Sequence, residues 1–110
     1  MKATGTFSVD LKPLDGFTHG VGGNNLARMS IEKVFQGELD AISTGEMLSA
    51  STAVKGSAAY VAIEQVVGSL NGKSGSFILQ HFASMQGDKQ QSNVVVVPDS
   101  GTGQLNGLSG

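Results

Sequence analysis

The feature that most constrains this chain is a period-two alternation of apolar and polar residues. In residues 2–11, small and apolar side chains take every second position, and polar side chains take the positions between them. Successive side chains of a β-strand point to opposite faces, so this spacing predicts a strand with one buried face. The residues predicted to share that face are Ala3, Gly5, Phe7, Val9 and Leu11.

Five further segments carry strand signals, and turn-forming residues separate them. Asn71-Gly72 is a strong hairpin signal, whereas residues 13–25 hold so many Gly, Pro and Asn residues that we predict a long, mobile loop. Residues 86–91 are predicted to form a polar turn, and residues 99–110 a turn that leads into an uncompleted strand. The other predicted strands are residues 26–35, 39–47, 58–70, 76–85 and 93–97.

A helix over residues 58–67 is the competing prediction, because small apolar residues are nearly continuous there. The β-branched residues of this segment and the hairpin turn after it favour a strand. The chain of 110 residues also has 16 glycines and only 15% charged residues, which favours turns and curved strands over long helices. We therefore predict one all-β domain over residues 1–110.

Composition and spacing exclude several classes of function. The net charge is −2 and no Lys/Arg cluster exists, so nucleic acid is not an expected partner. The absence of cysteine excludes disulfides and thiolate chemistry. His19 and His81 lack metal-ligand spacing, and the glycine-rich segments lack the features of a phosphate loop. We predict no metal, cofactor, membrane span or signal peptide, and a cytoplasmic location.

Long runs of the chain resemble the bacterial family known as domain of unknown function 3224. These runs are MKATGTF, ARMSIEKVFQGEL, STGEMLSASTAVKGSAAYVAIEQVVGSLNGKSGSFILQH and VVPDSGTGQLNGLSG. The resemblance implies a small antiparallel Greek-key β-barrel, calycin-like and similar to that of allene oxide cyclase. Since the activity of the family is not established, the resemblance predicts the fold better than the function.

Members of that family usually continue with a final strand pair after the GTGQLNGLSG segment, whereas this chain stops at Gly110. We therefore expect a barrel that is incomplete at its C-terminal end and has an exposed edge. Because exposed edges pair readily with other chains, we expect a homodimer or another homo-oligomer.

Tyr60 and Glu64 are the first candidate site residues, because they lie four apart on one predicted strand and share a face. A phenol and a carboxylate inside a barrel could donate and accept protons, since burial raises the pKa of a glutamate. In the alternative arrangement, Glu64 faces solvent, and Val61, Ile63 and Val67 fill the core. The greater apolarity of the odd-numbered face favours this second arrangement.

His81 lies on the strand paired with that of Tyr60 and Glu64, so it is a candidate proton-transfer group near them. Its alternation partners Phe77, Leu79 and Met85 are apolar and predict that it points inward. These three are the candidate ligand-binding residues, although a histidine in such a place is often only a hydrogen-bonded core residue.

Glu46 is a further candidate ligand-binding residue if a bulge at Gly45 turns it into the lumen. The alternative is a solvated carboxylate on a strand face. His19 lies in the predicted loop, which could cover the barrel mouth or simply be flexible, and we assign it no role.

Three functions fit this pattern. The favoured one is a barrel that binds a small apolar molecule. The second is an isomerase or cyclase that uses Glu64, Tyr60 or His81, in which Glu64→Gln is expected to leave folding intact and abolish turnover. The third is an interaction module whose interior is filled by its own side chains.

Overall fold

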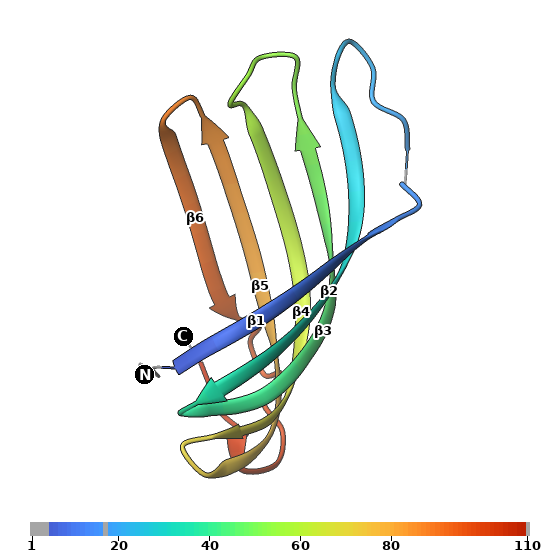
Figure 1. Ribbon diagram of the computed structural model, residues 1–110. Helices are drawn as coiled ribbons and strands as arrows, with labels where there is room; N and C mark the ends of the chain where they lie inside the picture. The colour runs from blue at the N-terminus through green and yellow to red at the C-terminus, as the bar shows by residue number, and fades with distance from the viewer. Residues whose placement is uncertain (1–4, 17, 110) are drawn as a thin grey trace.

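Almost all of the chain lies in six antiparallel strands that pair in chain order, as Figure 1 shows. The computed structural model describes residues 5–16 and 18–109. The all-β prediction is confirmed, and the helix considered for residues 58–67 is wrong because that segment lies inside a strand. The strands are β1 (Gly5–Leu14), β2 (Asn25–Gly37), β3 (Leu39–Ser51), β4 (Ala58–Leu70), β5 (Lys73–Gln86) and β6 (Lys89–Val96).

Several boundaries differ from the prediction. The β1 strand continues through Pro13 to Leu14, which an edge strand tolerates because the missing N–H need not pair on its free side. The polar turn predicted at residues 86–91 is present but shorter, at Gly87 and Asp88, since β5 ends at Gln86 and β6 begins at Lys89. Polar residues can pair there because the strand lies at a sheet edge. The start of the first predicted strand, residues 2–4, lies outside the described residues.

The Asn71-Gly72 hairpin is confirmed, with φ values of 51° and 82° at its two turn residues. This left-handed backbone is what a tight two-residue turn requires, and it suits Asn and Gly.

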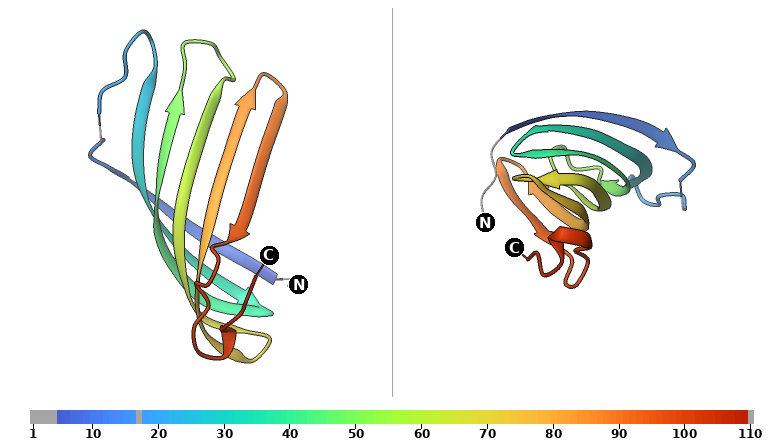
Figure 2. Two further views of the ribbon diagram at one scale, coloured as in Figure 1. Left: turned by 180° about the vertical axis from the view of Figure 1, so that it is seen from behind. Right: turned by 90° about the horizontal axis from the view of Figure 1, so that it is seen from below.

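The sheet is curled but not closed into a barrel. Figure 2 shows from below that it forms an open arc, with β1 on one side and β5 on the other. Closure requires the first and last strands to pair, whereas in the described residues β1 pairs only with β2 and β6 only with β5. The sequential strand order also contains no Greek-key crossover.

The two faces of the sheet differ in burial. The inner face, which the sheet curls around, carries the buried side chains of β4, namely Ala62, Glu64 and Val66. The outer face carries Val61 and Ile63, which are exposed.

The lower end of the inner face holds the hydrophobic core. Leu105 lies in the 3-10 helix η1 (Gly103–Leu105) and packs against the sheet. The chain after β6 is therefore a packed turn, and the predicted start of another strand is wrong for the described residues through 109. Among residues 5–16 and 18–109, η1 is the only helical element. No helix in these residues is long and apolar enough to cross a membrane. The buried core residues are Ala41, Val66, Leu70, Phe77 and Leu105.

Candidate functional site

The centre of the inner face holds a buried carboxylate, Glu64 of β4, whose exposed fraction is 0%. Strand alternation puts this side chain on the inner face, between those of Ala62 and Val66. Glu64 pairs in register with Gly45 of β3, and a Cβ atom at residue 45 would lie 2.1 Å from the carbonyl oxygen of Ile63. Glycine therefore permits the close approach of the two strands beside the carboxylate.

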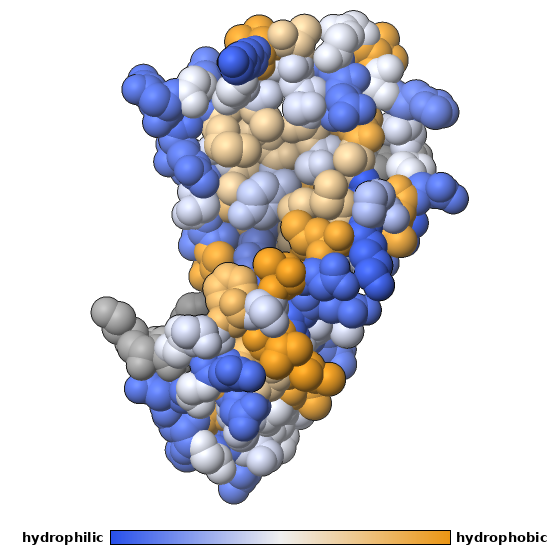
Figure 3. Space-filling model, in the orientation of Figure 1, coloured by the Kyte–Doolittle hydropathy of each residue, from blue (hydrophilic) through white to orange (hydrophobic). Residues whose placement is uncertain are grey.

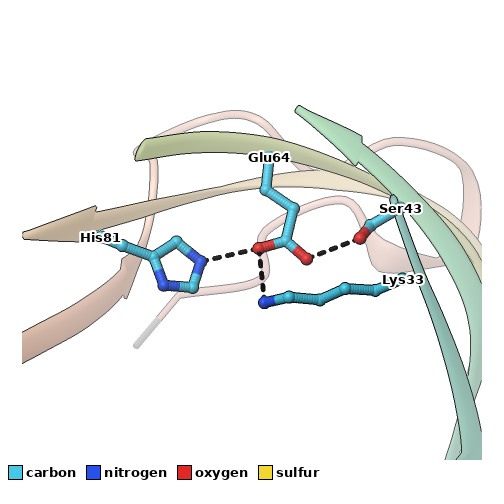
Figure 4. Close-up of polar contacts among 4 residues, drawn as sticks. All are labelled: Lys33, Ser43, Glu64 and His81. Carbon is cyan, nitrogen blue, oxygen red and sulfur yellow. Dashed lines mark hydrogen bonds and ion pairs between the residues drawn. The ribbon is translucent and has the colours of Figure 1, made fainter. Parts of the chain in front are cut away.

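Three side chains from three other strands contact this carboxylate, as Figure 4 shows. The hydroxyl of Ser43 on β3 donates to Oε1 of Glu64 at 2.6 Å. Nζ of Lys33 on β2 and Nε2 of His81 on β5 contact Oε2 at 3.1 Å and 2.7 Å. We call these four residues, Lys33, Ser43, Glu64 and His81, the Glu64 cluster.

The Glu64 cluster keeps its central carboxylate ionised. Burial by itself raises the pKa of Glu64, but hydrogen bonds from Ser43, Lys33 and His81, together with the positive charge of Lys33, outweigh burial. The pKa therefore lies below its ordinary value of 4.5. An ionised carboxylate only accepts hydrogen bonds, so Nε2 of His81 carries the hydrogen of their contact. In the neutral imidazole, Nδ1 then bears the free lone pair.

Two members of the Glu64 cluster have a partly accessible side. Side-chain exposure is 15% for Lys33 and 14% for His81, against 0% for Glu64. The Lys33 ammonium also lies 5.2 Å from the ring centre of Phe7 and 5.9 Å from that of Phe35. Figure 3 shows that apolar side chains occupy the middle of the face crossed by β1, with hydrophilic ones along its margins. The polar cluster is therefore set in mostly apolar surroundings.

Comparison with known proteins identifies the family of the chain. Residues 3–110 match the family model of DUF3224, a protein of unknown function. The chain belongs to the DUF3224 family. A crystal structure of a DUF3224 protein of unknown function from Shewanella oneidensis MR-1 has a TM-score of 0.93 and 56% sequence identity. That match covers 99% of this chain and 84% of the Shewanella chain. No curated protein matches the chain.

The inner-face position of Glu64 in this DUF3224 protein corrects the arrangement that the sequence favoured. Val61, Ile63 and Val67 do not fill the core, since each is about half exposed on the outer face. His81 points inward as predicted and contacts Glu64. Tyr60 shares the inner face, but it makes no hydrogen bond with Glu64 or His81 within the described part of the chain.

The predicted ligand-binding residues separate into different surroundings. Phe77 is buried in the hydrophobic core. Leu79 packs against this core and pairs in register with Glu64 on the neighbouring strand. Met85 is partly buried on the same face near the far end of β5. His19 lies in the connection between β1 and β2, away from the Glu64 cluster.

The bulge predicted at Gly45 is wrong, because the strand pairing runs through that residue without interruption. Glu46 consequently stays exposed on the outer face, where it pairs with Arg28 at 2.5 Å. The hydrogen bond from Arg28 lowers the pKa of Glu46. A groove beside this pair is lined by Leu48, Val61 and Ile63, and Ala62 and His81 also contribute to its lining.

Lys33 and Ser43 were not predicted as site residues. Lys33 interrupts the apolar inner face of β2, where it stands between Ile31 and Phe35. This interruption is the one signal in the sequence that could have identified it. Among residues 5–16 and 18–109, no group of three His, Asp or Glu side chains is placed to hold a metal ion.

Proposed function

We propose that the inner face binds a small, mostly apolar molecule that carries an oxygen acceptor, such as a carbonyl or carboxylate group. The observation that carries this proposal is the buried Glu64 carboxylate, which holds the Lys33 ammonium and the His81 ring at one place on an apolar face. Binding sites for small molecules typically combine apolar walls with a few fixed polar groups.

The hydrogen-bond donors of the Glu64 cluster that do not bind Glu64 determine which polar group the ligand carries. The Lys33 ammonium has three hydrogens, and within the described residues its only hydrogen bond goes to Glu64. Neighbouring Phe7 and Phe35 can contact the apolar part of a ligand at the same place. We therefore expect an oxygen of the ligand to bind Lys33 while the apolar part lies against the aromatic rings.

Binding can be tested with two fluorescent probes, the anionic 1-anilinonaphthalene-8-sulfonate and the uncharged Nile red. Lys33→Met is expected to weaken binding of the anionic probe about tenfold or more, because a charge-assisted hydrogen bond contributes roughly 1.5–3 kcal/mol. Binding of Nile red should change little. Fluorescence titration of both probes gives the dissociation constants.

Arg28→Met is the matched control, because it removes a cation from the outer face. It should leave the affinity for both probes unchanged, and circular dichroism should show that both variants are folded. Equal affinity of wild type and Lys33→Met for the anionic probe would contradict the proposal, as would weaker binding by Arg28→Met alone.

A second candidate function is proton transfer by an isomerase-type enzyme, and the 2.7 Å contact between Glu64 and His81 favours it. In this reaction, Nδ1 of His81 takes the proton from the carbon next to a substrate carbonyl, and Lys33 stabilises the negative charge that develops on the oxygen. The proton returns to another carbon, or to the same carbon, from protonated His81. Glu64 orients the ring through its contact with Nε2.

This chemistry is measurable as hydrogen–deuterium exchange of 2-undecanone in heavy water, followed by NMR. His81→Gln is expected to lower the protein-dependent exchange rate at least tenfold, because glutamine cannot take up the proton. Its affinity for Nile red should stay that of wild type. An exchange rate equal in wild type, His81→Gln and buffer would leave binding alone as the proposed function.

A further inference from the structure

The outer face of the sheet carries two groups of exposed apolar side chains, and the polar pair Thr44 and Gln65 lies between them. Seven large apolar side chains on this face are 39–58% exposed. Strand register arranges six of them in two rows, one across β2 to β4 and one across β3 to β5, with Ile63 of β4 between the rows. The first row is Val34, Ile42 and Val67, and the second row is Leu48, Val61 and Phe82. We call these seven residues the outer patch.

The surface area of the whole chain is large for its size. The chain exposes 7308 Å², whereas a folded monomer of 11.2 kDa is expected to expose about 5,700 Å². Its radius of gyration of 15.7 Å likewise exceeds the roughly 13 Å of a compact domain of this length. The excess of roughly 1,600 Å² is twice the area of about 800 Å² that one partner buries in a typical stable interface.

We propose that the outer patch is a homodimer interface, in which a second copy of this chain covers it through two-fold symmetry. Arg28 continues the second row beside Leu48, and Glu46 pairs in register with Ile63 between the rows. The two side chains carry opposite charges. Two-fold symmetry brings the same surface of both copies together, so Arg28 of one copy can face Glu46 of the other. The contact therefore joins the apolar rows and the complementary charges between them.

The sheet edges are less suitable for this association. The edge strand β1 contains Pro13, which has no N–H to donate, and its outer side chains include Asp10 and Lys12. At the opposite edge β6 begins with Lys89. Such residues hinder strand pairing between chains, whereas the outer patch has no lysine among its seven members.

Sedimentation velocity at tens of micromolar protein tests the dimer. Wild type should sediment with twice the monomer mass of 11.2 kDa. Ile63→Lys, which places a charge in the middle of the outer patch, should weaken dimerisation about 100-fold or more and give a monomer. Val21→Lys adds the same charge in the connection between β1 and β2, outside the patch, at an apolar residue that is 80% exposed, and should remain dimeric.

Because the chain contains no cysteine, Ile63→Cys introduces a single thiol for a second measurement. Oxidation should join two copies through residue 63, and Val21→Cys should give no such product. A monomeric wild type overturns the proposal, and so does a dimer that persists in Ile63→Lys, since that dimer would use another surface. Since Ile63 is half exposed, circular dichroism of Ile63→Lys is expected to match wild type.

Discussion

Replacing Glu64 with glutamine is expected to lower the free energy of unfolding by about 3 kcal/mol. Removing one partner of a buried ion pair typically costs about 3–5 kcal/mol, because the remaining charge is left without compensation. The lower end applies here, since Lys33 keeps 15% of its side chain exposed and can gain some contact with water. Urea denaturation followed by circular dichroism measures the difference.

Asp10→Asn is the control, since it also removes a carboxylate that pairs with a cation, Lys12. Both side chains of this pair are largely exposed, so its removal should leave the free energy of unfolding nearly unchanged. If Glu64→Gln were no less stable than Asp10→Asn, the Glu64 cluster would not hold the inner face together.

The stability difference between wild type and Glu64→Gln should also depend on pH. The folded-state pKa of Glu64 lies below its ordinary value of 4.5. The stabilisation by its ionised form is therefore fully present above about pH 5 and is lost as the pH falls through the lower, folded-state pKa. The two denaturation midpoints should accordingly converge at acid pH. A difference that stays constant throughout the acid range would contradict the assignment of an ionised, paired carboxylate.

This expected loss of stability revises what the sequence suggested for the same substitution. From the sequence alone, Glu64→Gln is expected to leave folding intact and to abolish turnover if the protein is an isomerase or cyclase. The period of two shows that residues 60, 62, 64 and 66 share a face, but it does not say which face is buried. In the folded sheet the inner face of β4 carries the buried Ala62 and Glu64, whereas Ile63 is about half exposed on the outer face. Apolarity alone therefore selected the wrong face.

The strands themselves were predictable, since alternation and the Asn71-Gly72 turn are local signals. The Glu64 cluster was only partly predictable, because it depends on the register of four strands. Lys33 and Glu64 are 31 residues apart in the chain and lie on strands separated by β3. His81 could be placed near Glu64 because a single hairpin connects their strands. The contact with Lys33 requires the curl of the sheet, which no local pattern reports.

Leu105→Ala is expected to lower the free energy of unfolding by about 3 kcal/mol, a large part of the 5–15 kcal/mol typical of a domain. Leu105 is 5% exposed and packs with Val66 and Phe77 in the core. Thr102 fixes this segment to β5, because its backbone N–H donates to the carbonyl oxygen of Ser76 and its hydroxyl accepts from the N–H of Ser76. Alanine would leave a cavity that the pinned backbone cannot close.

Leu14→Ala is the control for Leu105→Ala, because Leu14 is a leucine at the exposed end of β1. Its truncation should change stability by a small fraction of the Leu105 effect, since little apolar surface leaves the core. Thermal and urea denaturation of both variants give the comparison. Equal stability of the two variants would mean that the segment after β6 does not belong to the core. A loss of stability in Leu105→Ala alone means that the segment after β6 supports Val66 and Phe77. Val66 lies next to Glu64 on the inner face of β4, and Phe77 lies next to Leu79, the residue paired with Glu64, on β5.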